Sequence, residues 1–168
     1  MTKVLMVIAP ERYQDLEYER PKAVFEKAGY EVFTASTVEE ANGKLGGTAK
    51  VDVQLTDVNH EDYDVVTFIG GTGVFDYFEN PVAQEIATAF YNANKLTGAI
   101  CAAPGILANA GLLKGKTVTC WSGEAEHMQE IGANYTGNPV ERDGLIITGS
   151  GPDAATEFGE AIVIAVEG

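Results

Sequence analysis

Residues 96–105 have the sequence LTGAICAAPG. The run from Leu96 to Cys101 favours a short strand, and Pro104 begins a helical pattern that continues to Ala110. This stretch therefore predicts a strand, a sharp turn and a helix, with Cys101 at the turn. Alanines stand two positions before and two positions after the cysteine. Small residues are needed at both positions when the turn is tight and its backbone strained.

The same alternation of strands and helices extends from this stretch in both directions. Apolar runs predict further strands at residues 3–8, 30–35, 64–69, 117–121 and 145–148. Helical patterns occupy residues 16–28, 81–93 and 152–166, and the acidic stretch 123–132 contains another helix. Residues 43–55 predict a small antiparallel excursion. The alternation implies an α/β fold with a mainly parallel sheet and helices on both faces.

Length and composition favour one domain spanning residues 1–168. A chain of 168 residues with 45% hydrophobic content is too short for two full-sized domains. The start of the chain does not resemble a signal peptide, and no window approaches the length of a membrane span. The two cysteines suggest a reducing compartment, so we expect a cytoplasmic protein.

The formal net charge of −14 excludes several classes of partner. Binding to nucleic acid requires clustered Lys and Arg that neutralise phosphates, and the eleven basic residues are scattered. Anionic membranes are excluded for the same reason. We therefore expect neither nucleic acid nor a membrane as a partner.

Cys101 is the first candidate for chemistry. The turn resembles a nucleophile elbow, and a helix N-terminus stabilises a thiolate through its backbone N–H groups. The alternative is that Cys101 is a small buried hydrophobe, as free cysteines commonly are. Cys120 lies within the apparently unbroken strand pattern of residues 117–121, so for this cysteine burial is the better interpretation.

The other candidates are less specific. Gly70 and Gly71 follow a predicted strand and could turn their N–H groups toward developing negative charge, although a plain turn has the same pattern. Glu17 follows the first strand, where most glutamates are solvated surface charges. His60 is predicted in a surface turn and His127 in the acidic helix. No His/Cys spacing indicates a metal site.

The segment Ala99–Pro104 resembles the ThiJ/PfpI superfamily, in particular the branch of the Parkinson-associated DJ protein and its bacterial relatives. Three further segments support the resemblance, which spans nearly the whole chain. They are residues 15–29, with Glu17 four positions before Pro21; residues 63–71, which end in the paired glycines; and residues 142–158.

The resemblance implies a flavodoxin-like three-layer sandwich, usually a homodimer, that needs no cofactor. By position, Cys101 would be the nucleophile and Glu17 a protonated acid bonded to it. The backbone N–H groups of Gly71 and Ala102 would form the oxyanion site. Two neighbouring anions repel, so the thiol and the carboxyl should share a proton and titrate as a coupled pair.

The sequence departs from the family pattern at three positions. Ala102 follows the cysteine where the peptidase branch has a histidine. Asn134 is expected at the position from which the DJ-like branch often supplies a histidine. Ser150 replaces an arginine expected before Gly151. The missing histidines leave His127 or a neighbouring subunit as possible sources of a base.

Three functions are consistent with these residues. The first is a cofactor-independent glyoxalase III or deglycase that converts a small reactive carbonyl substrate, such as methylglyoxal, to lactate. The second is a redox sensor or stress chaperone that works through oxidation of Cys101. The third is an intracellular cysteine peptidase, which Ala102 disfavours because no adjacent base is present.

Overall fold

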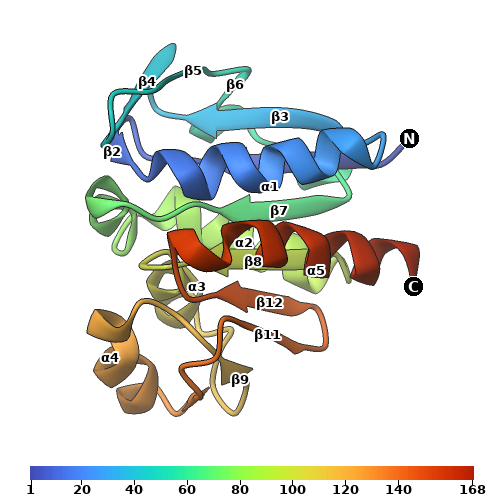
Figure 1. Cartoon of the computed structure of the whole chain (residues 1–168). Helices are drawn as coiled ribbons and strands as arrows, with labels where there is room; N and C mark the ends of the chain where they lie inside the picture. The colour runs from blue at the N-terminus through green and yellow to red at the C-terminus, as the bar shows by residue number, and fades with distance from the viewer.

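The computed structural model describes residues 1–168 and confirms the predicted α/β fold (Figure 1). Its central sheet has seven strands: β1 (Lys3–Val7), β3 (Glu31–Ser36), β6 (Val53–Gln54), β7 (Val65–Phe68), β8 (Leu96–Ile100), β11 (Val140–Asp143) and β12 (Ile146–Gly149). Their order across the sheet is β11-β12-β8-β7-β1-β3-β6. All neighbours are parallel except β11 and β12, which form an antiparallel hairpin at one edge.

Helices cover both faces of this sheet. They are α1 (Asp15–Lys27), α2 (Pro81–Asn92), α3 (Pro104–Asn109) and α5 (Ala155–Glu167), whereas α4 (Ala125–Glu130) packs against α3 and β10 (Asn134–Tyr135). Figure 1 shows α1 and α5 side by side on the near face and α2 and α3 behind the sheet. Short 3₁₀ turns are η1 (Leu55–Asp57), η2 (His60–Asp62), η3 (Thr72–Tyr77), η4 (Ser122–Glu124) and η5 (Pro152–Ala154). None of the helices is both long and apolar enough to cross a membrane.

The inner strands β1, β7, β8 and β12 are buried over nearly their whole length, because helices cover both faces of the sheet there. In β1, Val4 and Met6 pack into the core beneath α1 and α5, whereas Leu5 and Val7 pack into the core on the face of α2 and α3. Successive side chains of a strand point to opposite faces, so a continuous apolar run supplies both cores at once.

The antiparallel excursion is confirmed in part. Strands β4 (Glu40–Gly43) and β5 (Thr48–Lys50) pair antiparallel, and β2 (Glu11–Tyr13) lies parallel to β4. Residues 53–54 instead join the central sheet as its edge strand β6. The Asp52 carboxylate accepts a hydrogen bond from the Thr34 N–H, and the Asp52 N–H donates to the Thr34 carbonyl. These two bonds direct the chain onto the edge of β3.

The prediction of a strand over residues 117–121 is wrong beyond its second residue. Only β9 (Thr117–Val118) is regular, and it pairs with β10 (Asn134–Tyr135) outside the central sheet. Thr119 bonds to side-chain and loop partners instead: its N–H donates to Thr148 Oγ1 at 2.9 Å and its hydroxyl donates to the Asn138 carbonyl at 2.6 Å. These contacts replace the backbone hydrogen bonds that a strand would make with a neighbouring strand.

Pro21 lies inside a helix, where proline is unusual: α1 begins at Asp15, and Pro21 is its seventh residue. A proline there cannot donate to the carbonyl four residues earlier, which belongs to Glu17.

Parallel strands place their carboxyl ends at one edge of the sheet, where ligands of such folds bind. The segments after β7 and β8 and the first turn of α1 meet at this edge. The Asp15 carboxylate accepts hydrogen bonds from the N–H groups of Leu45 and Gly47, at 2.8 and 2.7 Å. Asp15 thereby ties the β4–β5 turn, which carries Lys44, to the start of α1.

We predict that Asp15→Ala weakens the fold by about 1–3 kcal/mol, because two partly buried N–H groups lose their acceptor. Urea denaturation of the variant measures the loss. The matched control is Asp153→Ala, since Asp153 is exposed; that change should stay within about 0.5 kcal/mol. Equal stabilities of the two variants would contradict the anchoring role of Asp15.

Candidate active site

Cys101 occupies the turn between β8 and α3, as predicted. Its φ is 63°, in the left-handed region that residues other than glycine rarely adopt. Its N–H donates to the Gly149 carbonyl at 2.8 Å, and its carbonyl accepts from the backbone N–H of Trp121 at 2.7 Å. The small neighbours Ala99 and Ala103 are fully buried. Hydrogen bonds on both sides thus hold the residue in a strained conformation.

Glu17 lies in the first turn of α1, and it is not a surface charge: its side chain is 0% exposed. Gln14 caps the helix, because its Oε1 accepts hydrogen bonds from the N–H groups of Leu16 and Glu17, at 2.7 and 3.2 Å. The N–H of Gln14 donates to the Gly70 carbonyl at 2.9 Å. The cap therefore joins the start of the helix to the segment that follows β7.

Gly70 lies between Glu17 and Cys101. Its N–H donates to Glu17 Oε1 at 3.0 Å. A Cβ added at this position would overlap Glu17 Oε1 and would lie 2.8 Å from the Cys101 Cβ and 2.9 Å from the Ile100 carbonyl oxygen. Only glycine fits this close approach. The structure therefore brings together the two side chains that the sequence analysis singled out.

Burial raises the pKa of Glu17 from its usual 4.5 to about 8. Hydrogen bonds from the Cys101 thiol and the Gly70 N–H, and the charge of Lys44, lower this pKa but do not offset the desolvation. The second carboxyl oxygen, Oε2, is buried without a nitrogen or oxygen partner. Glu17 is therefore predominantly protonated at neutral pH.

The pKa of the Cys101 thiol is also raised, first by burial and then by the negative charge and hydrogen bond of Glu17. The Ala102 N–H opposes this shift because it donates toward the sulfur. The sequence analysis expected backbone N–H groups at the start of the following helix to stabilise a thiolate. The Ala102 N–H does lower the pKa of the thiol, but burial and Glu17 raise it by more.

A pocket of about 270 Å³ opens beside this pair. Its lining residues are Gln14, Glu17, Lys44, Gly71, Thr72, Phe75, Cys101, Ala102, Trp121 and Pro152. The N–H groups of Gly71 and Ala102 donate to no oxygen of the protein. Both residues line the pocket together with Cys101, and the Ala102 N–H donates toward the Cys101 sulfur.

Neither histidine lies in this pocket. His127 Nε2 is 2.9 Å from Asn109 Oδ1, and its Nδ1 is 3.5 Å from Glu124 Oε1. Asn134 lies in β10, where its amide is 3.5 Å from Thr117 Oγ1, so the expectation that it stands near the cysteine is wrong. The residue at the pocket from that part of the chain is Trp121. Within the described chain, no cluster of three or more His, Cys, Asp or Glu side chains could hold a metal ion.

The sequence analysis missed the aromatic side chains of the pocket. Phe75 and Trp121 are 39% and 45% exposed, with ring centroids 6.3 Å apart. Trp121 is the only tryptophan of the chain and stands directly after Cys120. An aromatic residue at the end of an apolar run resembles core in a sequence, so no pattern distinguished it from a buried side chain.

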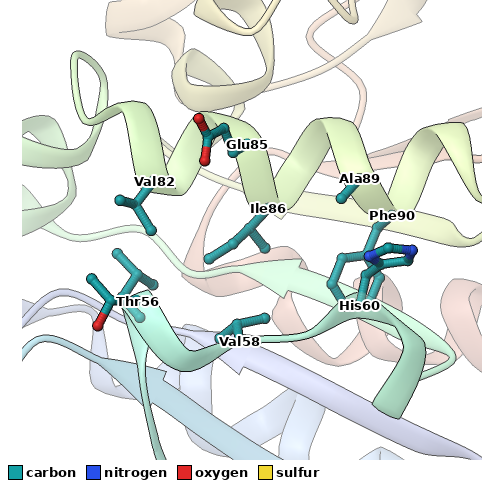
Figure 2. Close-up of a pocket in the computed structure, with 9 residues that line it drawn as sticks. Thr56, Val58, His60, Val82, Glu85, Ile86, Ala89 and Phe90 are labelled. Atoms are coloured by element: carbon teal, nitrogen blue, oxygen red, sulfur yellow. The ribbon is translucent and has the colours of Figure 1, made fainter.

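A second pocket, of about 200 Å³, lies between η1, η2 and α2 (Figure 2). Most of its lining residues are hydrophobic, and the set is Leu55, Thr56, Val58, His60, Val82, Glu85, Ile86, Ala89 and Phe90. Figure 2 shows the Glu85 carboxylate and the His60 ring well apart. It has no thiol and no paired acid and base, so the pocket beside Cys101 is the candidate active site.

We predict that Cys101 is alkylated before Cys120. Cys101 is partly exposed in its pocket, whereas Cys120 is 1% exposed, so the reagent reaches only the first of the two sulfurs readily. Mass mapping after brief iodoacetamide treatment identifies the labelled residue. The labelling rate at Cys101 should rise with pH, because its raised pKa leaves little thiolate at neutrality. Predominant labelling of Cys120 would contradict the structure.

We also predict a specific pH dependence of stability. The folded-state pKa of Glu17 exceeds the unfolded value, so between about pH 4.5 and pH 8 the folded state binds more protons than the unfolded state. Its contribution to stability is therefore lost as pH rises through this window. Denaturation at several pH values should show the decline in the wild type and a smaller decline in Glu17→Gln. Parallel curves would show that Glu17 does not titrate with a raised pKa.

Comparison with known proteins places the chain in a family. Residues 2–165 match the model of the DJ-1/PfpI family. The uncharacterized protein MJ0967 of Methanocaldococcus jannaschii is 42% identical over 98% of this chain and 82% of its own length. The "Putative cysteine protease YraA" of Bacillus subtilis is 31% identical over 94% of this chain and 95% of its own length.

Solved structures give the same result. The ThiJ/PfpI domain protein of Brachyspira murdochii superposes with a TM-score of 0.96 at 32% identity, over 98% of this chain and 96% of that one. The DJ-1beta protein of Drosophila melanogaster superposes with a TM-score of 0.89 at 27% identity, over 98% and 89%. The sequence match, the shared fold and the coverage of nearly the whole chain lead to one conclusion: this chain belongs to the DJ-1/PfpI family.

Proposed function

We propose that the chain is a cofactor-independent enzyme that converts reactive dicarbonyls such as methylglyoxal into 2-hydroxy acids such as lactate, in the manner of a glyoxalase III or deglycase. The observation that carries the proposal is the fully buried Glu17 carboxyl, with a pKa near 8, beside the only thiol that lines a pocket. At this pKa both protonation states are populated near neutral pH. A group that must accept and return a proton works best there.

In the first step, the sulfur of Cys101 adds to the aldehyde carbon of the substrate. A C–S bond forms, the C=O double bond becomes a single bond, and the oxygen takes up the thiol proton to give a hemithioacetal. The N–H groups of Gly71 and Ala102, which donate to no oxygen of the protein, would stabilise the negative charge that develops on this oxygen. The raised pKa of the thiol means that its proton must leave as the bond forms.

In the second step, Glu17 moves a proton. As a carboxylate it takes the proton from the former aldehyde carbon, giving an enediol, and it returns that proton to the neighbouring carbon. Water then hydrolyses the resulting thioester, which regenerates the Cys101 thiol and releases the acid. The aldehyde carbon is oxidised and the ketone carbon reduced by the same amount, so no external oxidant or cofactor is needed.

The name of the Bacillus subtilis relative favours a second candidate, a cysteine peptidase. An amide leaving group must be protonated, and a peptidase of this kind uses an imidazole beside the thiol. Here Ala102 follows the cysteine, and no imidazole lines the pocket. For this reason dicarbonyl conversion is the stronger proposal.

The same pair supports a role as a redox sensor or stress chaperone. A protonated Glu17 and the Ala102 N–H could both donate hydrogen bonds to a sulfinate on Cys101.

The proposal also includes a cytoplasmic location and a homodimer.

We predict that Glu17→Gln lowers the turnover of methylglyoxal by about a hundredfold or more, the usual scale for a positioned acid–base group. The amide keeps the shape of the side chain but cannot accept and return a proton. Purified protein assayed for lactate, with and without glutathione, gives the rate. Mass spectrometry of the same variant should still detect the initial Cys101 adduct.

Glu17→Asp is the matched control, because it retains the acid but withdraws it by one methylene. Its turnover should also fall, since a misplacement of about 1 Å costs about a hundredfold. Wild-type turnover in Glu17→Gln would remove Glu17 from the mechanism. Hydrolysis of casein that disappears in Cys101→Ala, without lactate formation by the wild type, would favour the peptidase instead.

A further inference from the structure

Aromatic side chains form one wall of the pocket beside Cys101. Only five large hydrophobic side chains of the chain are exposed, and two of them, Phe75 and Trp121, line this pocket. Their rings meet edge to face, at an interplanar angle of 74°. We name these two rings the aromatic wall. Exposed aromatic rings beside a reactive group indicate a surface that binds a ligand.

The backbone and the packing hold the indole ring of Trp121 in place. A Cβ added at Gly123 would overlap the six-membered ring of the indole, so the ring lies directly against that glycine. The backbone N–H of Trp121 donates to the Cys101 carbonyl at 2.7 Å. The position of the ring is therefore tied to the position of the thiol.

The phenyl ring of Phe75 is supported in a similar way. It packs against Phe78 with centroids 5.1 Å apart, and the ring of Phe78 lies where a side chain at Gly105 would project. Gly105 belongs to α3, the helix that follows Cys101. Both members of the aromatic wall are thus held by elements that also position the thiol, which lowers the entropic cost of binding a flat ligand.

The chemistry of the remaining lining limits what this ligand can be. The volume of about 270 Å³ is at the small end of ligand pockets, which span about 300–1,000 Å³. Such a space admits a single ring together with the reacting carbons. Near neutral pH Glu17 is largely uncharged, and Lys44 is the only cation in the lining. A neutral flat substituent therefore suits the wall.

We propose that the site selects α-oxoaldehydes that carry an aromatic substituent, arylglyoxals, over methylglyoxal. This inference rests on the proposed function. The aryl ring packs against Trp121 and Phe75 while the aldehyde carbon bonds to the Cys101 sulfur. The reaction adds one water and gives an aryl 2-hydroxy acid. The aldehyde carbon is oxidised as the ketone carbon is reduced, so the balance is the same as for methylglyoxal.

The first test compares kcat/KM for phenylglyoxal and methylglyoxal. The ratio should be about tenfold in favour of phenylglyoxal, as expected for one or two ring contacts, and it should fall toward one in Trp121→Ala. Ile164→Ala is the matched control, because Ile164 is an exposed hydrophobic residue of α5 that does not line the pocket. An unchanged ratio in Trp121→Ala would overturn the proposal.

The second test does not depend on catalysis. Trp121 is the only tryptophan, so intrinsic fluorescence reports on the aromatic wall directly. Mandelate, the product expected from phenylglyoxal, should change the emission at lower concentration than lactate, and Phe75→Ala should weaken this response. No response to mandelate, together with turnover of methylglyoxal, would overturn the aromatic preference and leave the proposed function standing.

The converse result separates the two claims. A fluorescence response to mandelate without turnover of any dicarbonyl would sink the proposed function and retain the aromatic subsite. Size-exclusion chromatography of Trp121→Ala tests whether Trp121 contacts a second copy of the chain instead of a substrate. A change of oligomeric state with an unchanged substrate ratio would assign Trp121 to contact with a second copy of the chain, and that outcome would overturn the proposal.

Discussion

Glu17 and Cys101 share one buried space, in which a negative charge on either group is costly. Desolvation is the largest contribution to both raised pKa values, and the mutual repulsion of the two anions adds to it at the thiol. The two groups therefore titrate as a coupled pair, and loss of the first proton leaves one proton for the sulfur and the carboxyl together. Every chemical role considered for the site depends on where that remaining proton lies.

The sheet makes this sharing possible. Parallel strands β7 and β8 end next to each other, so Gly70 and Cys101 meet although 31 positions separate them in the sequence. A residue with a side chain at position 70 would push the carboxyl and the thiol apart. Gln14 completes the arrangement, since it caps α1 and bonds to Gly70 at once. The strained backbone at Cys101 is unfavourable by itself. These hydrogen bonds and the burial of the strands offset its cost in free energy.

The surroundings of the Cys101–Glu17 pair differ from the peptidase pattern that the sequence analysis considered. Ala102 replaces a potential base with a methyl group, and the indole of Trp121 lies where the sequence analysis expected a polar residue from elsewhere in the chain. The site is therefore rich in aromatic surface and poor in bases. That balance suits a small carbonyl whose internal rearrangement requires one proton shuttle, and it does not suit cleavage of an amide.

The sequence by itself determined the alternation of strands and helices and the turn at Cys101, because periodicity and small residues act over a few positions. Glu17 was assigned as the acidic partner only through the resemblance to a known family. Only the tertiary structure decided that Glu17 is buried, that the thiol pKa is raised, and that Trp121 rather than Asn134 borders the pocket. Residues 119–121 illustrate the reason. Their pattern favours a strand, yet hydrogen bonds to Thr148 of β12 and to Cys101 in the turn after β8 replace those of a strand. Burial and pKa depend on such distant contacts, which no local pattern contains.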